Sequence, residues 1–576
     1  MADERPIVVL GAGINGAALA RELVLSAVPV VVVEADDVAC GSTAWSSRLI
    51  HGGLRYLEYG EIGLVRESLA ERDRLVRLAP HLVAPLPFYV PVRRRLGGLA
   101  AAAARLAGCE GWARRLRPAR GRGSWTIAAG LTLYDLLATG SGWPRHRTLP
   151  AGGAGLPAVD RDRFPLACTY ADAQLLYPER FTVELLVDAR RAAAERNVAF
   201  EVHTHRQTAF LPGGILRLAG SGERAEIDLR PAAIVNATGA WVDRTLATVF
   251  PGADGPGGRL IGGTKGSHIL LLAPRLRAAL ADHGVYAEAD DGRPVFVLPF
   301  GPDLVLVGTT DIPFAGDPAT ARADEAEIDY LLAATAALFP ETAPGRAAVQ
   351  QHYCGVRPLP AAGAAGKAAG AITRRHMLVR HPRAPLPAWS IVGGKLTTCR
   401  SLAETAAAEV LAALGRPVTG SSRERPLPGA CAGESRAAVV RAAAAAAVQC
   451  GCGNHEAAAA AERLVQLFGA RAAEACGAGT AGLIRGTPLP LAVAAFCVRH
   501  EWARTLDDLV ERRLLLGFDP ALCHGALEDM AAVLADLGLV PRADVAAEAR
   551  ACAARLAVRY DRRLAPDPPA AGRESR

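Results

Sequence analysis

The amino-acid sequence predicts an α/β protein that combines a Rossmann-like parallel sheet, a second sheet of mixed or antiparallel strands, and a C-terminal all-α domain. The chain opens with an apolar strand, a glycine-rich turn and a helical run, which is the pattern of a parallel βαβ unit. Its middle holds strands without helical crossovers, and beyond Arg416 the composition shifts to Ala, Leu, Glu and Arg. With 576 residues, 51% hydrophobic and 21% charged, the chain has room for roughly two to four domains.

The opening residues predict a dinucleotide site. Residues 6–10 form the first buried strand, and three glycines allow a tight turn, close approach to a pyrophosphate, and packing of the helix on the strand. Glu34 ends the second apolar strand, where its carboxylate can accept hydrogen bonds from an adenosine ribose and disfavours a 2′-phosphate. This favours FAD or NAD over NADP, at a site that includes Gly11, Gly13, Ile14, Asn15, Gly16 and Glu34.

The composition excludes several classes of protein. No stretch reaches about 18 uninterrupted apolar residues and the N-terminus lacks a secretory signal, so we expect a cytoplasmic protein without a transmembrane helix. Twelve cysteines without paired spacing indicate reduced thiols, and no metal site is expected. The net charge of +7 is modest for this length and does not imply nucleic acid as a partner.

A loop of small and polar residues follows the nucleotide unit. Residues 40–47 are mostly small, and His51, two glycines, Arg55 and Tyr56 come next. Such a loop can approach a planar ligand closely and present polar side chains to it, although a solvated surface loop has a similar composition. We expect contacts with the cofactor from Ser42, Ser46, Ser47, His51, Gly52 and Gly53.

Together with the opening, this loop resembles the FAD-dependent, quinone-linked glycerol-3-phosphate dehydrogenase family. The run Ser46-Ser47-Arg48-Leu-Ile-His51-Gly-Gly53-Leu-Arg55-Tyr56-Leu-Glu58 follows the family pattern nearly residue for residue, with Arg48 in the place of a lysine. The resemblance implies a two-dinucleotide-binding flavoprotein fold with FAD as cofactor. It also implies oxidation of sn-glycerol 3-phosphate to dihydroxyacetone phosphate by hydride transfer to flavin N5, with the electrons passed to a membrane quinone.

Two further turns look like parts of the flavin site. Residues 234–237 form an apolar strand that ends in a Thr-Gly turn, as in the Ala-Thr-Gly strand that lines FAD in this fold. Residues 390–398 have the pattern of a strand, a glycine turn and a helix start, whose amides can meet the isoalloxazine, while the spacing excludes a P-loop. We assign to the cofactor site Thr238, Gly239, Gly393, Gly394, Lys395, Leu396 and Thr397.

The middle of the chain predicts a sheet that roofs the flavin. Residues 268–272, 295–300 and 304–310 are strands without crossover helices. The family pattern is matched by Gly308-Thr309-Thr310-Asp311, Gly355-Val-Arg357-Pro-Leu359 and Ala371-Ile-Thr-Arg374, and we place Asp311 at the cofactor. The chain departs from the family at Tyr177-Pro178, which leaves the shape of that part of the site open.

Four cations are expected to converge near the flavin: Arg55, Arg357, Arg374 and Lys395. They imply a substrate with two negative charges, because Arg offers bidentate donors to a phosphate and Lys acts as a point charge. His51 and His268 suit proton transfer near neutrality, although either could only contact the flavin. We expect catalytic roles for His51, Arg55, His268, Arg357 and Lys395, and glycerol 3-phosphate binding by Arg55, Tyr56, His268, Thr309, Arg357, Arg374 and Lys395.

Alternatives stay open for the reaction. An oxidase would return the electrons to O2 and form H2O2, and an amine or amino-acid oxidase of this fold would need fewer cations and an aromatic cage. A flavin-binding scaffold would have no turnover, which the retained polar constellation argues against.

Residues 92–122 are rich in arginine, interleaved with Leu, Ala and Trp112. Such a stretch can lie on an anionic membrane surface, although a solvated loop fits the residues equally well. The resemblance favours peripheral attachment to the inner face of the cell membrane. Residues 499–513 resemble the family's C-terminal helical signature, whose role is structural or interfacial.

The predicted domains follow from these segments. A discontinuous FAD-binding domain covers 1–90, 165–255 and 355–415, with a membrane-facing insertion at 91–164, a substrate-binding sheet at 256–354, a helical domain at 420–562 and a disordered tail at 563–576. A homodimer is possible on the sequence.

Overall fold

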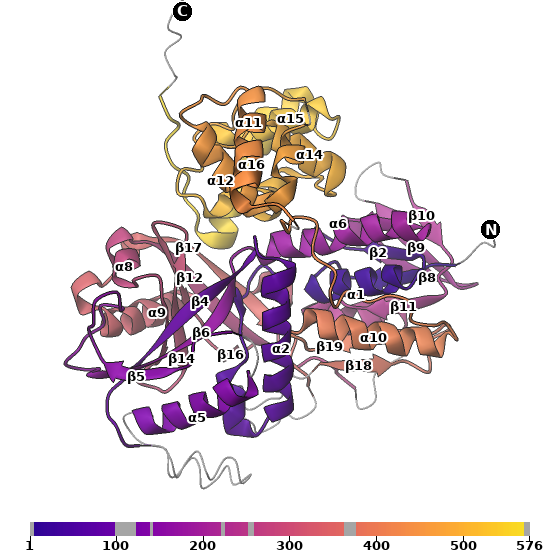
Figure 1. Ribbon diagram of the computed structural model, residues 1–576. Helices are drawn as coiled ribbons and strands as arrows, with labels where there is room; N and C mark the ends of the chain where they lie inside the picture. Colours follow the sequence, from indigo (N-terminus) through magenta and orange to yellow (C-terminus); the bar gives the residue numbers. More distant parts are fainter. Residues whose placement is uncertain are drawn as a thin grey trace, which may run out of the picture.

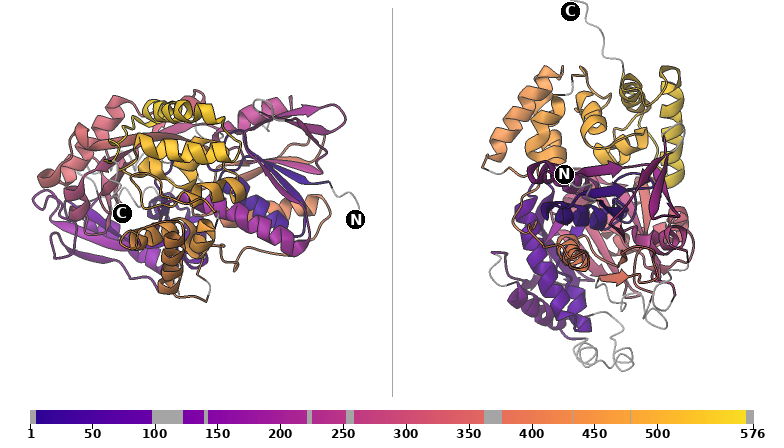
Figure 2. Two further views of the ribbon diagram at one scale, coloured as in Figure 1. Left: turned by 90° about the horizontal axis from the view of Figure 1, so that it is seen from above. Right: turned by 90° about the vertical axis from the view of Figure 1, so that its right-hand side faces the viewer.

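The computed structural model describes residues 5–97, 122–138, 142–220, 225–251, 258–361, 376–431, 433–477 and 479–569. Two sheets lie side by side, and a domain of helices, orange to yellow, covers one end of both (Figure 1). The views in Figure 2 place the same helical domain against both sheets. The predicted fold class is therefore confirmed.

The first body is a six-stranded sheet of order β18-β19-β11-β1-β2-β7, parallel except for β18. Ile7 in β1 pairs with Val30 on one side and Ala233 on the other. Its strands are β1 (Ile7–Leu10), β2 (Val30–Val33), β7 (Phe200–His203), β11 (Ala233–Asn236), β18 (Met377–Arg380) and β19 (Ala388–Val392).

Different layers cover the two faces of this sheet. Ile7 and Val9 pack with α1 (Ile14–Leu25), α6 (Pro178–Arg196) and α10 (Cys399–Ala413). Val8 and Leu10 pack with α7 (Val242–Val249) and with the small sheet of β8 (Arg206–Leu211), β9 (Ile215–Gly220) and β10 (Ile227–Leu229). Because successive strand residues point to opposite faces, a continuous apolar run serves both layers.

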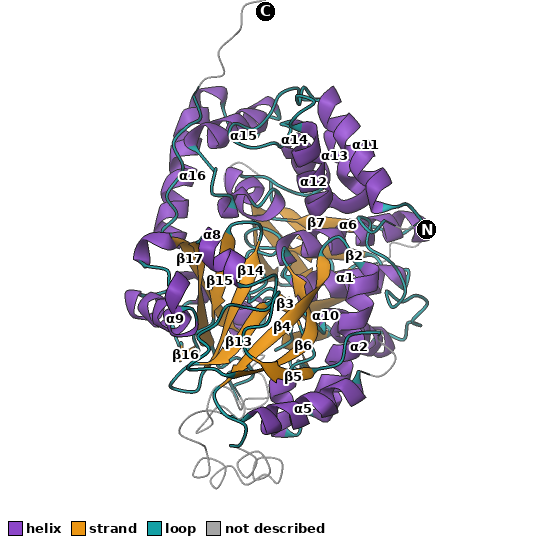
Figure 3. Cartoon of the chain, turned by 60° about the vertical axis from the view of Figure 1, so that its left-hand side comes forward, coloured by secondary structure: helices purple, strands orange, loops and turns teal. Residues whose placement is uncertain are grey.

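The second body is a ten-stranded sheet, whose strands β4, β6 and β13 to β17 are labelled in Figure 3 with helices around them. Its core path is β16-β12-β15-β14-β13-β4-β6-β3, with β17 beside β12 and β5 beside β6. The pairing is antiparallel except between β13 and β4. The strands are β3 (Leu49–Ile50), β4 (Val83–Val92), β5 (Arg147–Pro150), β6 (Leu166–Leu175), β12 (Thr264–Leu272), β13 (Gly284–Glu288), β14 (Pro294–Phe300), β15 (Leu304–Gly308), β16 (Ile312–Pro313) and β17 (Val349–Arg357).

The strand pairing differs from the predicted domain boundaries. The boundaries gave β4 and β6 to the FAD-binding domain and β5 to the insertion, whereas all three strands pair within the second sheet. A strand carries no local signal of its partner, because partners such as Phe88 and Tyr170 are far apart in sequence. The helices beside this sheet are α2 (Ile62–Leu78), α5 (Ser124–Leu137), α8 (Pro274–Ala279) and α9 (Glu325–Leu338), and the 3-10 helix η1 is Leu54–Tyr59.

Among the described residues, no helix combines the length and the apolar character that crossing a bilayer requires. The expectation of a membrane-facing insertion falls partly on residues 98–121, which lie outside the described part of the chain.

The helical domain begins after the linker that follows α10. Its helices are α11 (Arg436–Gln449), α12 (Ala457–Phe468), α13 (Ala472–Cys476), α14 (Ala492–His500), α15 (His524–Asp536) and α16 (Val545–Tyr560), with a π-helical turn η8 at Asp508–Arg513. The predicted disordered tail needs a correction at its start. Ala565 donates a backbone hydrogen bond to Leu522 (2.8 Å), and Asp567 accepts one from the Gly525 amide (2.7 Å), so the segment is tied to the domain at residues 565 and 567.

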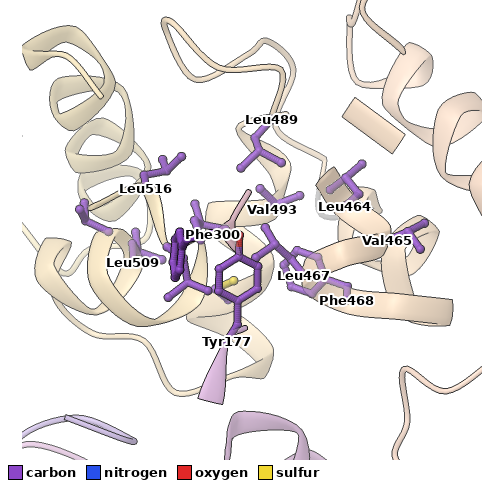
Figure 4. Packing of buried hydrophobic residues seen from close by; sticks show 14 of the residues in the cluster. Tyr177, Phe300, Leu464, Val465, Leu467, Phe468, Leu489, Val493, Leu509 and Leu516 are labelled. Atoms are coloured by element: carbon purple, nitrogen blue, oxygen red, sulfur yellow. The ribbon is translucent and has the colours of Figure 1, made fainter. Parts of the chain in front are cut away.

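The departure at Tyr177-Pro178 belongs to the contact between the domains. Figure 4 shows Tyr177 and Phe300 packed among apolar side chains of the helical domain, Phe468 included. The Tyr177 hydroxyl accepts a hydrogen bond from Arg463 Nη1 (2.7 Å), and Pro178 is the first residue of α6. Tyr177 is absent from the wall of the large cavity described below, so the departure shapes domain docking and not that cavity.

Candidate active site

A cavity of about 720 Å³ lies where the two sheets meet. Its wall includes residues after the carboxyl ends of β1, β2, β11 and β19, the edge at which open parallel sheets bind ligands. Strand β17 and the loop 40–48 close the other side. The cavity therefore joins the dinucleotide unit to the second sheet.

The three glycines of the first turn have different roles. Gly11 has φ +99°, and a Cβ there would lie 2.8 Å from the Ala237 carbonyl oxygen; one at Gly16 would overlap the Gly11 carbonyl oxygen. A Cβ on Gly13 would meet only Thr43 Oγ1, at 3.5 Å. Gly11 and Gly16 are thus required by the fold, whereas the space at Gly13 opens into the cavity and fits an approaching pyrophosphate.

Glu34 marks one end of the cavity. Its Oε2 accepts a hydrogen bond from the Ala12 amide (2.7 Å), and its Oε1 accepts one from the Asp36 amide (3.1 Å). Burial raises the pKa of the Glu34 carboxyl, while the two amides oppose that shift. Each oxygen can accept a further hydrogen bond, which fits the hydroxyls of a ribose.

The second glycine turn faces the first. Gly393 and Gly394 have φ of +80° and +103°, conformations that favour glycine, and Asn15 Nδ2 donates to the Gly393 carbonyl (3.3 Å). Asn15 Oδ1 is buried without a hydrogen-bond partner among the described residues. The His51 amide donates to Thr397 Oγ1 (3.1 Å), which ties the loop after residue 50 to the start of α10.

His268 lies at the other end of the cavity. Its Nε2 is 2.8 Å from Ser47 Oγ, and its ring stacks on Tyr353 at 4.9 Å between ring centres. Burial, together with the charges of Arg357 and Arg48, lowers the pKa of His268 to about 3. The imidazole is therefore neutral in the free protein, which differs from the expectation of a histidine that titrates near neutrality.

Two of the predicted cations reach this end. Arg357 donates from Nη1 to Asp311 Oδ1 (2.7 Å) and from Nη2 to Thr309 Oγ1 (3.0 Å). Lys395 Nζ lies 3.7 Å from the centre of the Tyr56 ring, in cation-π contact. Arg357 thus places a positive charge near His268, and Lys395 places a second one elsewhere on the wall of the same cavity, at Tyr56.

Most of the predicted site residues meet in this one cavity. Its wall contains Gly11, Gly13, Ile14, Asn15, Glu34, Ser42, Ser46, Ser47, His51, Tyr56, Thr238, Gly239, His268, Arg357, Gly393, Gly394, Lys395, Leu396 and Thr397. Gly16, Gly52, Gly53, Thr309 and Asp311 lie behind the wall; the last two hold Arg357. Arg374 and the side chain of Arg55 lie outside what the structure describes.

Sequence reasoning missed other wall residues. These are chiefly Thr43, Trp45, Arg206, Thr208, Trp241 and Arg559. Thr43 lies within a loop already selected, and its hydroxyl accepts from the Ile14 amide (3.1 Å), so the polar composition of that loop was an available signal. Arg206 and Arg559 come from a hairpin and from the last helix, and nothing local in the sequence connects them to the glycine turns.

Comparison with known proteins gives consistent relatives. The family of FAD dependent oxidoreductases matches residues 6–379. A glycerol-3-phosphate dehydrogenase of Synechocystis is 35% identical over 535 residues, 88% of each chain. The aerobic glycerol-3-phosphate dehydrogenase of Escherichia coli is 32% identical over 70% of this chain and 73% of its own. A D-erythritol 1-phosphate dehydrogenase of Brucella abortus is also 32% identical, over 69% and 71%.

One solved structure has the same fold over nearly the whole chain. The glycerol-3-phosphate dehydrogenase of Bacillus halodurans, complexed with FAD, superposes with a TM-score of 0.69 at 19% identity and covers 97% of this chain and 95% of its own.

Proposed function

Because the chain belongs to the FAD-dependent oxidoreductases, within the glycerol-3-phosphate dehydrogenase family, we propose that it oxidises sn-glycerol 3-phosphate to dihydroxyacetone phosphate. The hydride would pass from C2 to flavin N5, and the electrons would leave to a membrane quinone. The observation that carries the proposal is that one cavity holds Arg357 near a neutral His268 and, on the same wall, the second cation Lys395.

FAD would be held by the turn around Gly13, by Glu34 and by the turn 393–397, and when bound it supplies the hydride acceptor. Arg357 would orient the phosphate, because Asp311 and Thr309 fix the plane of its guanidinium. Lys395 would stabilise the alkoxide that develops at C2.

The proton of the C2 hydroxyl would pass to Nε2 of His268, which now contacts the Ser47 hydroxyl. The charge of Arg357 is one cause of the lowered pKa of His268. A bound phosphate dianion would offset that charge, so substrate binding would make the imidazole a better proton acceptor.

A related polyol phosphate is the second candidate substrate, since the D-erythritol 1-phosphate dehydrogenase is as similar as some glycerol-3-phosphate dehydrogenases. Both substrates would present a phosphate to Arg357 and a secondary hydroxyl to the flavin. They differ in length, and the cavity end near Tyr56 would discriminate between them.

The test is anaerobic mixing of the purified holoenzyme with each phosphate ester, with unphosphorylated glycerol and with a simple amino acid, followed through flavin absorbance. We expect rapid reduction by glycerol 3-phosphate alone among the four, or by the erythritol ester if the second candidate holds. Reduction by glycerol or by the amino acid at the same rate would refute a phosphate site. Mixing the reduced enzyme with quinone or with O2 then identifies the acceptor.

The substitution Arg357→Lys keeps a charge but removes the planar fork. We expect catalytic efficiency to fall about tenfold to a hundredfold, as for the loss of one charge-assisted hydrogen bond. FAD content should not change, and a wild-type rate of flavin reduction by the variant would remove Arg357 from the substrate site.

We also propose peripheral attachment to an anionic membrane surface beside α5. This helix exposes Trp125 (61%) and Leu136 (64%), and Leu96 (63%) lies on the neighbouring loop. In the sequence, the arginine-rich residues 98–121 come between Leu96 and this helix. Trp125 and Leu136 lie about three turns apart on α5 and therefore share one face of that helix. Figure 1 shows α5 at the end of the molecule opposite the helical domain.

Vesicle flotation at low salt tests the attachment. The double substitution Trp125→Ser and Leu136→Ser should weaken binding to anionic vesicles by about a hundredfold, because each of the two buried apolar side chains contributes about 1.5 kcal/mol. Val558→Ser is the matched control, since Val558 is 80% exposed on α16, a helix of the C-terminal domain and not of the proposed surface. Equal binding by both variants, or no binding by the wild type, would refute the proposal.

A further inference from the structure

The last helix of the chain reaches the cofactor cavity. Figure 3 shows α16 running from the helical domain towards β17. Arg559, near its end, lies on the cavity wall, with its guanidinium carbon 4.7 Å from the centre of the Trp45 ring. The helical domain, which follows the linker at 416–428, thus contributes a cation to a cavity whose glycine turns all lie before that linker.

The charge of Arg559 is only weakly neutralised by protein. Its one ion pair in the described structure is with Glu511 Oε2, at 3.7 Å. That oxygen already accepts from the Tyr560 hydroxyl (2.5 Å) and from Arg512 Nη1 (3.2 Å). Among the described residues, no hydrogen bond of the Arg559 guanidinium to protein is found, so its donors are available to a ligand.

The other arginines of the cavity wall are engaged. Arg48 pairs with Glu179 at 2.6 Å, Arg244 with Asp317 at 2.5 Å, and Arg357 with Asp311 at 2.7 Å. Arg206 donates to the Ala225 carbonyl at 2.6 Å. Arg559 is therefore the arginine of the described wall that is best placed to receive an anionic group.

The position of Arg559 points to the middle of the dinucleotide. The segment 40–47 runs from Glu34, where Cys40 Sγ lies 3.9 Å from Oε1, to His268, which contacts Ser47. Trp45 lies along this segment, two residues after Thr43, which binds the first amide of α1. A dinucleotide that places its ribose at Glu34 and its reacting ring near His268 has its two phosphates between these ends.

The helical domain also holds the loop that carries Glu34. Asp37, fully buried, accepts from Arg512 Nε (2.6 Å) and from both terminal nitrogens of Arg513 (2.8 and 2.7 Å). His205, whose amide donates to the Asp36 carbonyl (2.8 Å), contacts Asp508 with Nε2 at 3.0 Å. The turn η8 therefore holds the loop that follows Glu34, at Asp37, through these ion pairs.

We propose that the helical domain completes the FAD site: Arg559 donates to the pyrophosphate of FAD, while Arg512 and Arg513 position the loop of Glu34 through Asp37. The proposal rests on FAD binding and is independent of which alcohol is oxidised. It assigns to the C-terminal domain a role in holding the cofactor in addition to covering the two sheets.

The test compares Arg559→Gln with Arg550→Gln, which removes the same charge from an exposed position of α16. Apoprotein of each is titrated with FAD and, separately, with riboflavin, which has the same ring and no phosphate, and binding is read from quenching of flavin fluorescence. We expect Arg559→Gln to weaken FAD binding about tenfold to a hundredfold and to leave riboflavin binding unchanged. Arg559→Lys should recover part of the loss, and Arg550→Gln should behave as the wild type.

Two outcomes would overturn the proposal. One is wild-type FAD affinity in Arg559→Gln; the other is an equal loss of FAD and riboflavin, which would mean that the residue acts only through packing. Circular dichroism of each apoprotein shows that the helical domain is folded during the measurement. Because no substrate is present, a protein that binds FAD and ignores glycerol 3-phosphate would refute the proposed reaction and leave this inference standing.

Discussion

The substitution Gly13→Ala should separate cofactor binding from folding. Gly13 has φ −70° and ψ 176°, which any residue adopts, and the added Cβ would meet only Thr43 Oγ1 at ordinary contact distance, 3.5 Å. The reduced freedom of the unfolded chain stabilises the variant by about 0.4 to 1 kcal/mol. Alanine is a poorer N-cap than glycine, so the free energy of unfolding of the apoprotein should change by less than about 1 kcal/mol.

FAD binding should respond much more strongly. The same Cβ would occupy the space through which the pyrophosphate approaches the amides at the start of α1. Losing one or two hydrogen bonds to a charged group costs about 1.5 to 3 kcal/mol each, so affinity should fall at least about tenfold and up to about ten-thousandfold or more.

Gly16→Ala is the matched comparison. Its Cβ would overlap the Gly11 carbonyl oxygen and lie 3.4 Å from the Ala237 Cβ, so the helix would have to move away from β1. Such overpacking costs about 1 to 3 kcal/mol and outweighs the helix propensity that alanine gains. Urea unfolding of both apoproteins, followed by circular dichroism, and FAD titration provide the two readouts. If Gly13→Ala unfolds as easily as Gly16→Ala, or binds FAD like the wild type, the division of roles between the glycines is wrong.

Three further predictions concern ionisable groups. Burial raises the pKa of the Glu501 carboxyl, but the charges of Arg180 and Arg471 outweigh burial and hold this pKa well below its usual range. The carboxylate should therefore stabilise the folded protein fully above about pH 4.5, and its contribution should fall as the pH drops towards the folded-state pKa; urea unfolding at pH 7 and at pH 3 measures the difference. Glu501→Gln leaves those arginines buried beside a neutral amide, so the free energy of unfolding should fall by about 3 to 5 kcal/mol at pH 7. The stability of this variant should no longer fall between about pH 4.5 and pH 3 through this group. Lys395→Met should lower kcat more than it raises KM, because an ammonium beside a developing alkoxide acts mainly in the transition state. Steady-state assays measure both constants, and a variant with a raised KM and an unchanged kcat would assign Lys395 to ground-state binding. Since the pKa of His268 is about 3, the pH profile of kcat/KM should show no inflection from free His268 between pH 5 and pH 8, and a step that disappears in His268→Asn would contradict its neutral state.

The N-terminal unit was predictable because its signals are local. The first strand, the glycine turn, the helix, the second strand and Glu34 all fall within the first 34 residues. The residues of β1 are all apolar because both faces of the sheet are covered by other layers. The second sheet was predicted only in its middle. β12, β14 and β15 lie close together in the chain, and β15 pairs with both of the others. β4 and β6 join the sheet from distant positions in the sequence, and strand patterning does not specify a partner.

The site divides in the same way. Residues in motif strings, such as Ser47, His51 and Lys395, line the cavity. Asp311 matched the family pattern equally well but lies behind the wall, because its carboxylate binds Arg357. A matched string indicates that a residue is near the site; only the fold shows whether it faces the ligand or supports a residue that does.

The buried charges between the helical domain and the FAD-binding domain contribute more to position than to stability. Arg180 and Glu501, and Arg513 and Asp37, are pairs in which both side chains have no exposure. Replacing such pairs with apolar residues of similar volume is often neutral or stabilising, because desolvation offsets their attraction. Apolar contact alone, as at Tyr177 and Phe468, allows two domains to slide slightly against each other. A guanidinium that donates two hydrogen bonds to one carboxylate allows only one arrangement. We infer that these pairs fix the helical domain in the one position that brings Arg559 to the cavity and holds Asp37 in the loop that follows Glu34.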